Sequence, residues 1–322
     1  MNFNQILGHD RQIEILRRAF GTDHLAHAYL FHGPDGVGKR LVAMALVQAI
    51  FCTDGQGCGH CTACRKIAHQ NHPDIHFLEP DGNSIKIEQI RELQRELNFR
   101  PLEATYKVGL IDQAERMTTG AANALLKTLE EPPGTTLLIL LTPQPQRLLE
   151  TILSRCQPLA FTRHTDARIQ NVLEEKLGLD ETEAHILAAL SDGSFKKAFG
   201  RDKDLYLEKR RDLLKTLTGL SSGSILPVLE FAEQLASDKA DLPDILEIFQ
   251  AFYRDVLLML HRRDENQLIN LDLLDRIRQM ARKEPVNAVL DKLEALAAAR
   301  THLERNVNRQ LAMEVLLLRL TA

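Results

Sequence analysis

The stretch GPDGVGKR at residues 33–40 constrains the fold of this chain more than any other part of the sequence. It matches the phosphate-loop pattern G-x-x-x-x-G-K-[ST] at Gly33, Gly38 and Lys39, and departs from it at Arg40. In such a loop, glycines let backbone N–H groups approach phosphate oxygens, and the lysine adds a mobile positive charge. An apolar run precedes the loop and apolar residues at helical spacing follow it, so we predict a strand–loop–helix unit.

Two side chains near this loop argue against nucleotide hydrolysis. The pattern ends in Ser or Thr because a hydroxyl binds Mg²⁺, whereas the guanidinium of Arg40 cannot bind a cation. The apolar run at residues 106–112 reads as a strand that ends at Asp112, the place of a second Mg²⁺-binding acid, or else of a helix cap. The next residue, Gln113, cannot accept a proton as a glutamate would. We therefore predict that the loop fold is kept and its ATPase activity is lost.

Four of the five cysteines, Cys52, Cys58, Cys61 and Cys64, follow the helix after the loop. Their spacing, C-x5-C-x2-C-x2-C, suits a closed tetrahedral site for structural Zn²⁺, because two intervening residues let a tight loop present both sulfurs. Four reduced thiols without a metal are the alternative, and His60 could replace one ligand. A catalytic zinc is disfavoured because four thiolates leave no open coordination position.

Alternating strand and helix signals up to about residue 163 predict an α/β fold in which helices wrap a parallel sheet. Strands are expected at residues 28–31, 74–78, 106–112, 136–141 and 157–161. Residues 3–8 are expected to be extended, and residues 147–154 to form a short helix. The ligand site of such a sheet lies at the carboxyl ends of its strands, where Thr142 follows the fourth apolar run.

The rest of the sequence contains only helical signals, with apolar residues three and four positions apart. We predict three domains: residues 1–163 of nucleotide-binding type with the cysteine insertion, a helical lid at 164–203, and a helical collar at 204–322. Helices are expected at residues 87–98, 118–130, 166–177 and 181–190, from 195, and at 205–217, 225–235, 242–261, 271–282, 286–300 and 308–320. The basic clusters 209–211 and 262–263 are expected to be solvated helix ends.

The bulk composition disfavours several other classes. A net charge of −4 gives no general attraction to nucleic acid, and the absence of tryptophan disfavours a base-stacking platform. An autonomous DNA-binding protein is therefore the weaker alternative. No apolar run has the length of a membrane span, and we expect no signal peptide at the N-terminus.

Several stretches resemble one family. HAYLFHGPDGVGK at residues 27–39, AANALLKTLEEPP at 121–133 and TILSRC at 151–156 resemble the AAA+ modules of bacterial DNA polymerase III clamp-loader subunits. Those modules also carry a four-cysteine insertion after the loop helix. The helical remainder is similar in layout to the lid and collar domains of these subunits, with most sequence signal in NVNRQLAMEVLLLRL at 306–320. The resemblance therefore implies an AAA+ P-loop module with a small lid and an all-α collar.

The departures from the family pattern favour a non-motor subunit, with an ATP-hydrolysing motor subunit of gamma/tau type as the alternative. Motor subunits keep a full loop and an Asp-Glu pair, and they carry an arginine sensor where this chain has Lys196. The resemblance implies a vestigial site for ATP or ADP, with an incomplete set of Mg²⁺ ligands. Its residues would be Gly33, Gly36, Gly38, Lys39, Arg40, Asp112, Gln113, Thr142 and Lys196.

The resemblance also implies a role in the ATP-dependent loading of a sliding clamp onto primed DNA during replication. Arg155, in the Ser-Arg-Cys motif, would then act in trans as an arginine finger in the ATP site of a neighbouring motor subunit. An arginine in an ordinary surface ion pair is the alternative. The implied partners are the gamma/tau and delta subunits and, through the complex, the clamp and DNA. The implied location is the bacterial cytoplasm, at the replisome, with no membrane partner.

Overall fold

The computed structural model describes residues 2–200, 204–220, 223, 225–237, 242–305 and 307–321. They form two compact units. The first, here the sheet unit, comprises the residues up to His164 together with Ser194–Lys196, and the second, the helical unit, comprises Thr165–Gly193 and Lys197–Ala322. Among the described residues, no helix combines the length and the apolar character needed to cross a membrane.

The sheet unit is built on five parallel strands in its described part, in the order β2-β3-β4-β1-β5. Their bounds are β1 (Ala28–His32), β2 (Ile75–Leu78), β3 (Lys107–Ile111), β4 (Thr136–Thr142) and β5 (Gln157–Ala160). Strand β4 is buried at every position, as its unbroken apolar run predicts for a central parallel strand. The register sets His32 opposite Thr142, so β1 and β4 end at the same edge of the sheet.

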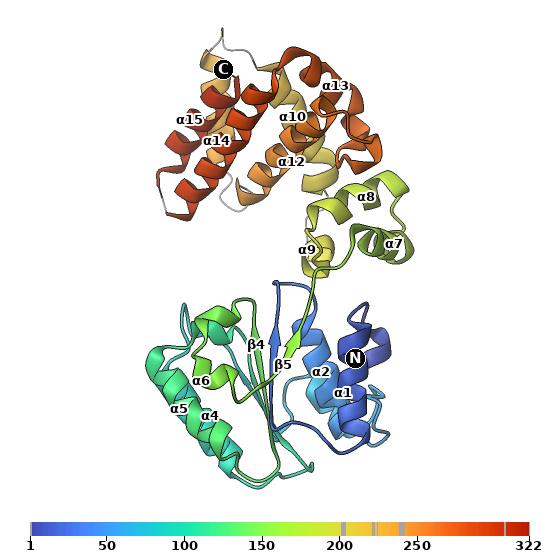
Figure 1. Ribbon diagram of the computed structural model, residues 1–322, viewed down its shortest axis with the longest axis vertical. Coiled ribbons are helices and arrows are strands. Elements are labelled where there is room, and N and C mark those ends of the chain that lie inside the picture. The colour runs from blue at the N-terminus through green and yellow to red at the C-terminus, as the bar shows by residue number, and fades with distance from the viewer. Residues whose placement is uncertain are drawn as a thin grey trace. The chain divides into compact units, whose positions relative to one another are not determined.

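Helices cover both faces of this sheet (Figure 1). One layer contains α1 (Asp10–Gly21), α2 (Lys39–Phe51) and α3 (Thr62–Ala68), and the other contains α4 (Ile87–Asn98), α5 (Thr119–Glu130) and α6 (Glu150–Leu153). Side chains alternate along each strand: Phe31 and Ile139 enter the core under α2, whereas Leu30 and Leu140 enter the core under α4 and α5. This two-sided burial explains why the strands read as continuous apolar runs.

The residues after the sheet unit's main segment form helices only, in the described part. Their bounds are α7 (Asp166–Leu177), α8 (Glu181–Leu190), α9 (Phe195–Gly200), α10 (Arg210–Gly219), α11 (Ile225–Ser237), α12 (Leu242–Leu260), α13 (Leu274–Lys283), α14 (Val286–Glu304) and α15 (Arg309–Thr321). Helix α12 packs against α8, α10, α13 and α14, and α15 packs against α11 and α14. The predicted lid helix α8 thus belongs to the same unit as the predicted collar, and the three-domain division stays a prediction. Residues 201–203, at the predicted boundary between lid and collar, and Asn306, in the stretch 306–320, lie outside the described residues.

The expected fold class is confirmed, but two local expectations are wrong and one helix was not predicted. Residues 3–8 are not extended throughout, because Asn2 and Gln5 cap each other around a 3-10 turn, η1 (Phe3–Gln5). Residues 147–154 are not one helix: a 3-10 turn, η3 (Pro145–Arg147), precedes the four-residue α6. The helix that was not predicted is α3, within the cysteine insertion. The sulfur of Cys61 accepts the backbone N–H of Cys64 and so caps this helix.

The expectation that the basic cluster 209–211 is solvated is also wrong, at Arg210. This side chain is fully buried, and its Nε donates to the carbonyl of Tyr206 at 2.9 Å. Its Nη1 donates to Asn270, and its Nη2 bonds Asp272 Oδ2 at 2.5 Å. The neighbouring Arg211 is exposed and bonds the same carboxylate oxygen at 2.8 Å. Residues 262–263 are exposed, as expected.

Candidate nucleotide and metal sites

The four cysteines of the insertion converge: their Sγ atoms all lie within 4.8 Å of one another. Three backbone N–H groups donate to these sulfurs, from Cys58 to Cys52 (3.2 Å), from Cys61 to Cys58 (3.4 Å) and from Cys64 to Cys61 (3.4 Å). A tetrahedral ion with Zn–S bonds of about 2.3 Å sets sulfurs about 3.8 Å apart, so the cluster fits a metal ion. Cys58 also lies within reach of His60 and Asp54, which keeps the histidine close to the cluster.

The thiols of this cluster differ in how readily they ionise. Burial by itself raises the pKa of Cys52, but backbone N–H groups of Cys58, Asp54 and Gln56 outweigh it and lower this pKa to about 6. Burial raises the pKa of Cys64 to about 12. A coordinated thiol is deprotonated, so a metal ion would supply the charge that stabilises the Cys64 thiolate in this buried place.

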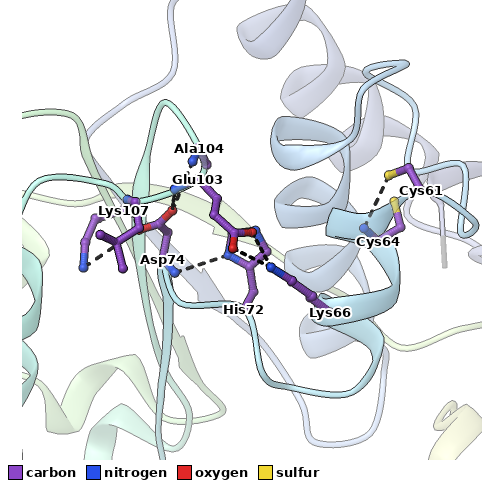
Figure 2. A network of polar contacts seen from close by, with 9 residues as sticks. Cys61, Cys64, Lys66, His72, Asp74, Glu103, Ala104 and Lys107 are labelled. Atoms are coloured by element: carbon purple, nitrogen blue, oxygen red, sulfur yellow. Dashed lines mark hydrogen bonds and ion pairs between the residues drawn. The ribbon is translucent and has the colours of Figure 1, made fainter.

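Ion pairs and hydrogen bonds connect the cysteine module to the sheet (Figure 2). Lys66, on α3, binds both carboxylate oxygens of Glu103 at 2.5 and 2.6 Å, and His72 Nε2 lies 3.9 Å from the same group. The buried Asp74, at the start of β2, accepts the backbone N–H groups of residues 102–104 at 2.7–3.1 Å. Burial alone would raise the pKa of Asp74, but these bonds and Lys107 outweigh it and lower the pKa. The module is therefore fixed to β2 through one loop.

All three glycines of the phosphate loop have positive φ, and the chain's own packing also requires two of them, Gly33 and Gly36. Gly33, Gly36 and Gly38 have φ values of 141°, 74° and 109°. A Cβ at Gly33 would lie 2.1 Å from the carbonyl oxygen of Phe161, and one at Gly36 would lie 2.2 Å from Ser194 Oγ. The pattern that predicted phosphate contact is thus maintained here by close approach between segments of the sheet unit.

Carbonyl groups of the loop are bound from within the chain. Lys39 Nζ donates to the carbonyls of Gly33 (2.6 Å) and Pro34 (2.7 Å), and burial lowers the pKa of this lysine. The carbonyl of Val37 contacts Nε2 of both His9 (2.7 Å) and His164 (3.0 Å). These contacts hold the loop's conformation from within the chain.

The guanidinium of Arg40 lies where the chemistry of Mg²⁺ binding would need an oxygen. It bonds Asp112 Oδ2 at 3.2 Å and also bonds Glu79. The other oxygen of Asp112 accepts the N–H of Gln113 at 2.9 Å. The segment after Asp112 begins with a 3-10 turn, η2 (Ala114–Arg116), whose N-cap is Gln113 and which has no side-chain cap; Thr118 caps α5, so the alternative of a capping role for Asp112 is wrong. A cation already neutralises the carboxylate, and this donor set does not fit Mg²⁺.

The remaining predicted site residues gather around the same loop. Thr142 is buried at the end of β4, and its hydroxyl donates to Glu115 Oε2 at 2.8 Å. The backbone N–H of Lys196 donates to the carbonyl of Gly36 at 3.2 Å. The sequence reasoning missed Glu79 and Glu115. Glu79 follows β2 as Asp112 follows β3, and this shared position at the carboxyl edge was the available signal.

Arg155 lies away from this loop in the fold. It precedes the amino end of β5, whereas the loop follows the carboxyl end of the parallel neighbour β1. Its Nη2 bonds Glu130 Oε1 at 2.7 Å, and its Nη1 donates to the carbonyl of Thr151 at 2.9 Å. The side chain is 34% exposed. The structure therefore does not bring Arg155 to the chain's own phosphate loop.

The sheet, its loop and the helical remainder define a P-loop AAA+ protein in which Arg40, bonded to Asp112, stands at the last position of the loop pattern. The chain belongs to the DNA polymerase III delta subunit family: a model described as DNA polymerase III, delta subunit, matches residues 8–165, and its C-terminal counterpart matches residues 205–322.

Curated relatives agree with this assignment. DNA polymerase III subunit delta' of Bacillus subtilis is 36% identical over 315 residues, covering 96% of this chain and 95% of the relative. The delta' subunit of Pseudomonas aeruginosa is 33% identical over 307 residues, covering 92% of each. Subunit tau of Bacillus subtilis is 28% identical over 321 residues, and the match covers 91% of this chain but only 57% of tau. The chain is thus homologous to the delta' clamp-loader subunit and related to tau.

Proposed function

We propose that this chain is the non-motor, delta'-type stator of a DNA polymerase III clamp-loader complex, and that it supports ATP-dependent loading of the sliding clamp onto primed DNA. The contact of Arg40 with Asp112 carries the proposal, because it places a fixed cation on the carboxylate that a motor subunit would use for Mg²⁺. Nearly full-length similarity to two delta' subunits supports it. The partners would be gamma/tau and delta subunits in the bacterial cytoplasm, at the replisome.

The chain's own nucleotide site is proposed to be vestigial. Lys39 donates to the carbonyls of Gly33 and Pro34, and the carboxylate of Asp35 lies 4.0 Å from its ammonium group. ATP or ADP would therefore bind weakly and without turnover. The isolated chain should show no ATPase activity, and turnover that Lys39→Ala abolishes would instead support the motor-subunit alternative.

Arg155 is proposed to act in trans, as a finger in the ATP site of the adjacent motor subunit. Its ion pair with Glu130 is partly exposed, and an exposed pair contributes only about 0–1 kcal/mol. The guanidinium can therefore exchange Glu130 for a neighbour's γ-phosphate at small cost. There it would stabilise the charge that develops during phosphoryl transfer.

The test is ATPase activity of the reconstituted complex with clamp and primed DNA. Arg155→Ala should leave assembly intact on size exclusion and lower stimulated turnover by about tenfold or more at the site it completes. Arg147→Ala is the control, because Arg147 is an exposed arginine just before α6, whereas Arg155 lies just after it. Stimulated turnover that is the same in both variants would remove the finger role.

The cysteine cluster is proposed to hold one structural Zn²⁺. Four convergent sulfurs with three N–H···S bonds support this ion, and four thiolates leave no coordination position for catalysis. Metal analysis of the purified chain should find one zinc per molecule. A metal-free chain with four reactive thiols would contradict the assignment.

An exposed apolar strip on α15 is proposed as the collar contact with a neighbouring subunit. Leu311, Val315 and Leu318 lie at positions i, i+4 and i+7, and each is more than two-fifths exposed. Replacing Leu311 and Val315 by Asp should release the chain from the complex while its own unfolding temperature stays nearly unchanged. Retained assembly would show that another surface holds the collar.

A further inference from the structure

A groove of about 690 Å³ lies between the edge strand β2 and helix α4. Among the described strands, β2 stands at the edge of the sheet and pairs with β3 alone. The N–H groups of Val108 and Asp112 donate to the carbonyls of Asp74 and Leu78, both at 2.9 Å. In a parallel pair, the N–H and carbonyl groups of alternate residues face the partner strand. The carbonyl of Ile75, and the N–H and carbonyl of Phe77, therefore face away from β3. In the described chain this edge has no strand partner.

The opposite wall of the groove is acidic. Glu88, Glu92 and Glu96 follow one another at four-residue spacing on α4, and Glu79 lies at the end of the strand. No lysine or arginine belongs to the described lining. Glu92 also pairs with Arg95 and Glu79 with Arg40, whereas Glu88 and Glu96 make no ion pair in the described chain. The groove therefore carries uncompensated negative charge beside open peptide groups.

The side chain of His76, at the same groove, contains a buried nitrogen that makes no hydrogen bond in the described structure. Its ring lies among the lining side chains, and its Nε2 is buried without a hydrogen-bond partner in the described structure. Burial, and after it the charge of Lys107, lowers the pKa of this histidine, which favours the neutral ring. This wall of the groove therefore holds an imidazole nitrogen that the described chain leaves without a hydrogen bond.

The spacing of the carboxylates matches the repeat of an extended peptide. Four residues of an α-helix advance about 6 Å, and two residues of a β-strand advance about 6.6 Å. Helix α4 packs along β2 and β3, so a strand added to β2 would run beside the line of carboxylates. Every second side chain of that strand would then face one glutamate.

We propose that this groove binds an extended basic segment of a protein partner, which pairs with the open edge of β2 and sets alternate Lys or Arg side chains against Glu88, Glu92 and Glu96. Backbone bonds would supply affinity and the spacing of charges would supply selectivity. The inference does not depend on the stator role, since it uses neither the phosphate loop nor Arg155.

Two labelled peptides of equal composition test the register. In an extended chain, all lysines of KVKVKVKV project from the same face, whereas those of KKVVKKVV are divided equally between the two faces. Fluorescence anisotropy with the full chain should show that the alternating peptide binds about tenfold more tightly, with affinity falling as salt rises. Equal affinity for the two peptides, or equal affinity for a neutral SVSVSVSV peptide, would overturn the proposal.

Charge-neutral variants locate the site. The triple variant Glu88→Gln, Glu92→Gln, Glu96→Gln should bind the alternating peptide about tenfold more weakly. The control triple variant Glu131→Gln, Glu175→Gln, Glu294→Gln removes the same charge from exposed positions outside the groove and should bind normally. The same loss in both variants would place binding elsewhere. If the groove variant fails to fold, as judged by circular dichroism, the peptide pair on the unmodified chain still decides the question.

Discussion

Substitution of Arg210 by Met is expected to destabilise the helical unit severely. The side chain is fully buried, and its three bonded nitrogens contact Tyr206, Asn270 and Asp272. Methionine keeps much of the apolar volume but leaves a buried carboxylate and a buried amide oxygen short of a donor. Breaking a buried ion pair on one side costs about 3–5 kcal/mol. For a unit of this size that corresponds to a fall in Tm of about 6–20 °C.

Arg211→Met is the matched control for this prediction. Arg211 binds the same oxygen of Asp272, but its side chain is 54% exposed, so its loss should cost about 0–1 kcal/mol. The assay is thermal unfolding by circular dichroism, with hydrogen exchange of α10 and α12 to confirm which unit opens. Equal destabilisation by the two variants would refute the argument that burial decides the strength of this pair.

The pH dependence provides a second check on the same mechanism. Burial alone would raise the pKa of Asp272, but hydrogen bonds and charge from Arg210 and Arg211 outweigh it and lower this pKa. A lowered folded-state pKa stabilises the fold above the ordinary aspartate value of about 4, and this contribution disappears as the pH falls through the folded value. Arg210→Met should therefore weaken the loss of stability on acidification, compared with the unmodified chain.

Three further substitutions or treatments test the sheet unit. Gly36→Ala should lower the free energy of unfolding by about 2 kcal/mol or more, because the added Cβ would meet Ser194. The control Gly134→Ala is also at positive φ but in open space, and it should cost about 1 kcal/mol. Similar Tm values for the two variants would contradict this. Asp74→Asn should lower the free energy of unfolding, measured in urea, by about 2–4 kcal/mol, because an amide cannot accept all three N–H groups. A change under about 0.5 kcal/mol, the size typical of a surface substitution, would count against this reasoning. Removing the metal with a chelator should lower the Tm and expose the four thiols to a thiol reagent, and no change in either would argue against a structural ion.

Local sequence patterns were enough to predict much of this protein. The loop at residues 33–40 and the four cysteines are each contained in a short stretch, so their spacing alone limits what they can form. The strands and most helices follow from apolar periodicity, because burial on one face or on two leaves its repeat in the sequence. The incomplete motif by itself also predicts that Arg40 disturbs the Mg²⁺ position.

The contacts between distant segments were decided by tertiary structure alone. Sheet order sets Arg40 against Asp112, 72 residues away, and sets His164 against Val37, 127 residues away. Sequence periodicity shows which side of an element is apolar, but it does not show which polar group another element will bring opposite. Arg210 and Arg211 illustrate this: adjacent residues of one type were expected to be alike, and the packing of Asn270 and Asp272 against α10 buries one and leaves the other in solvent.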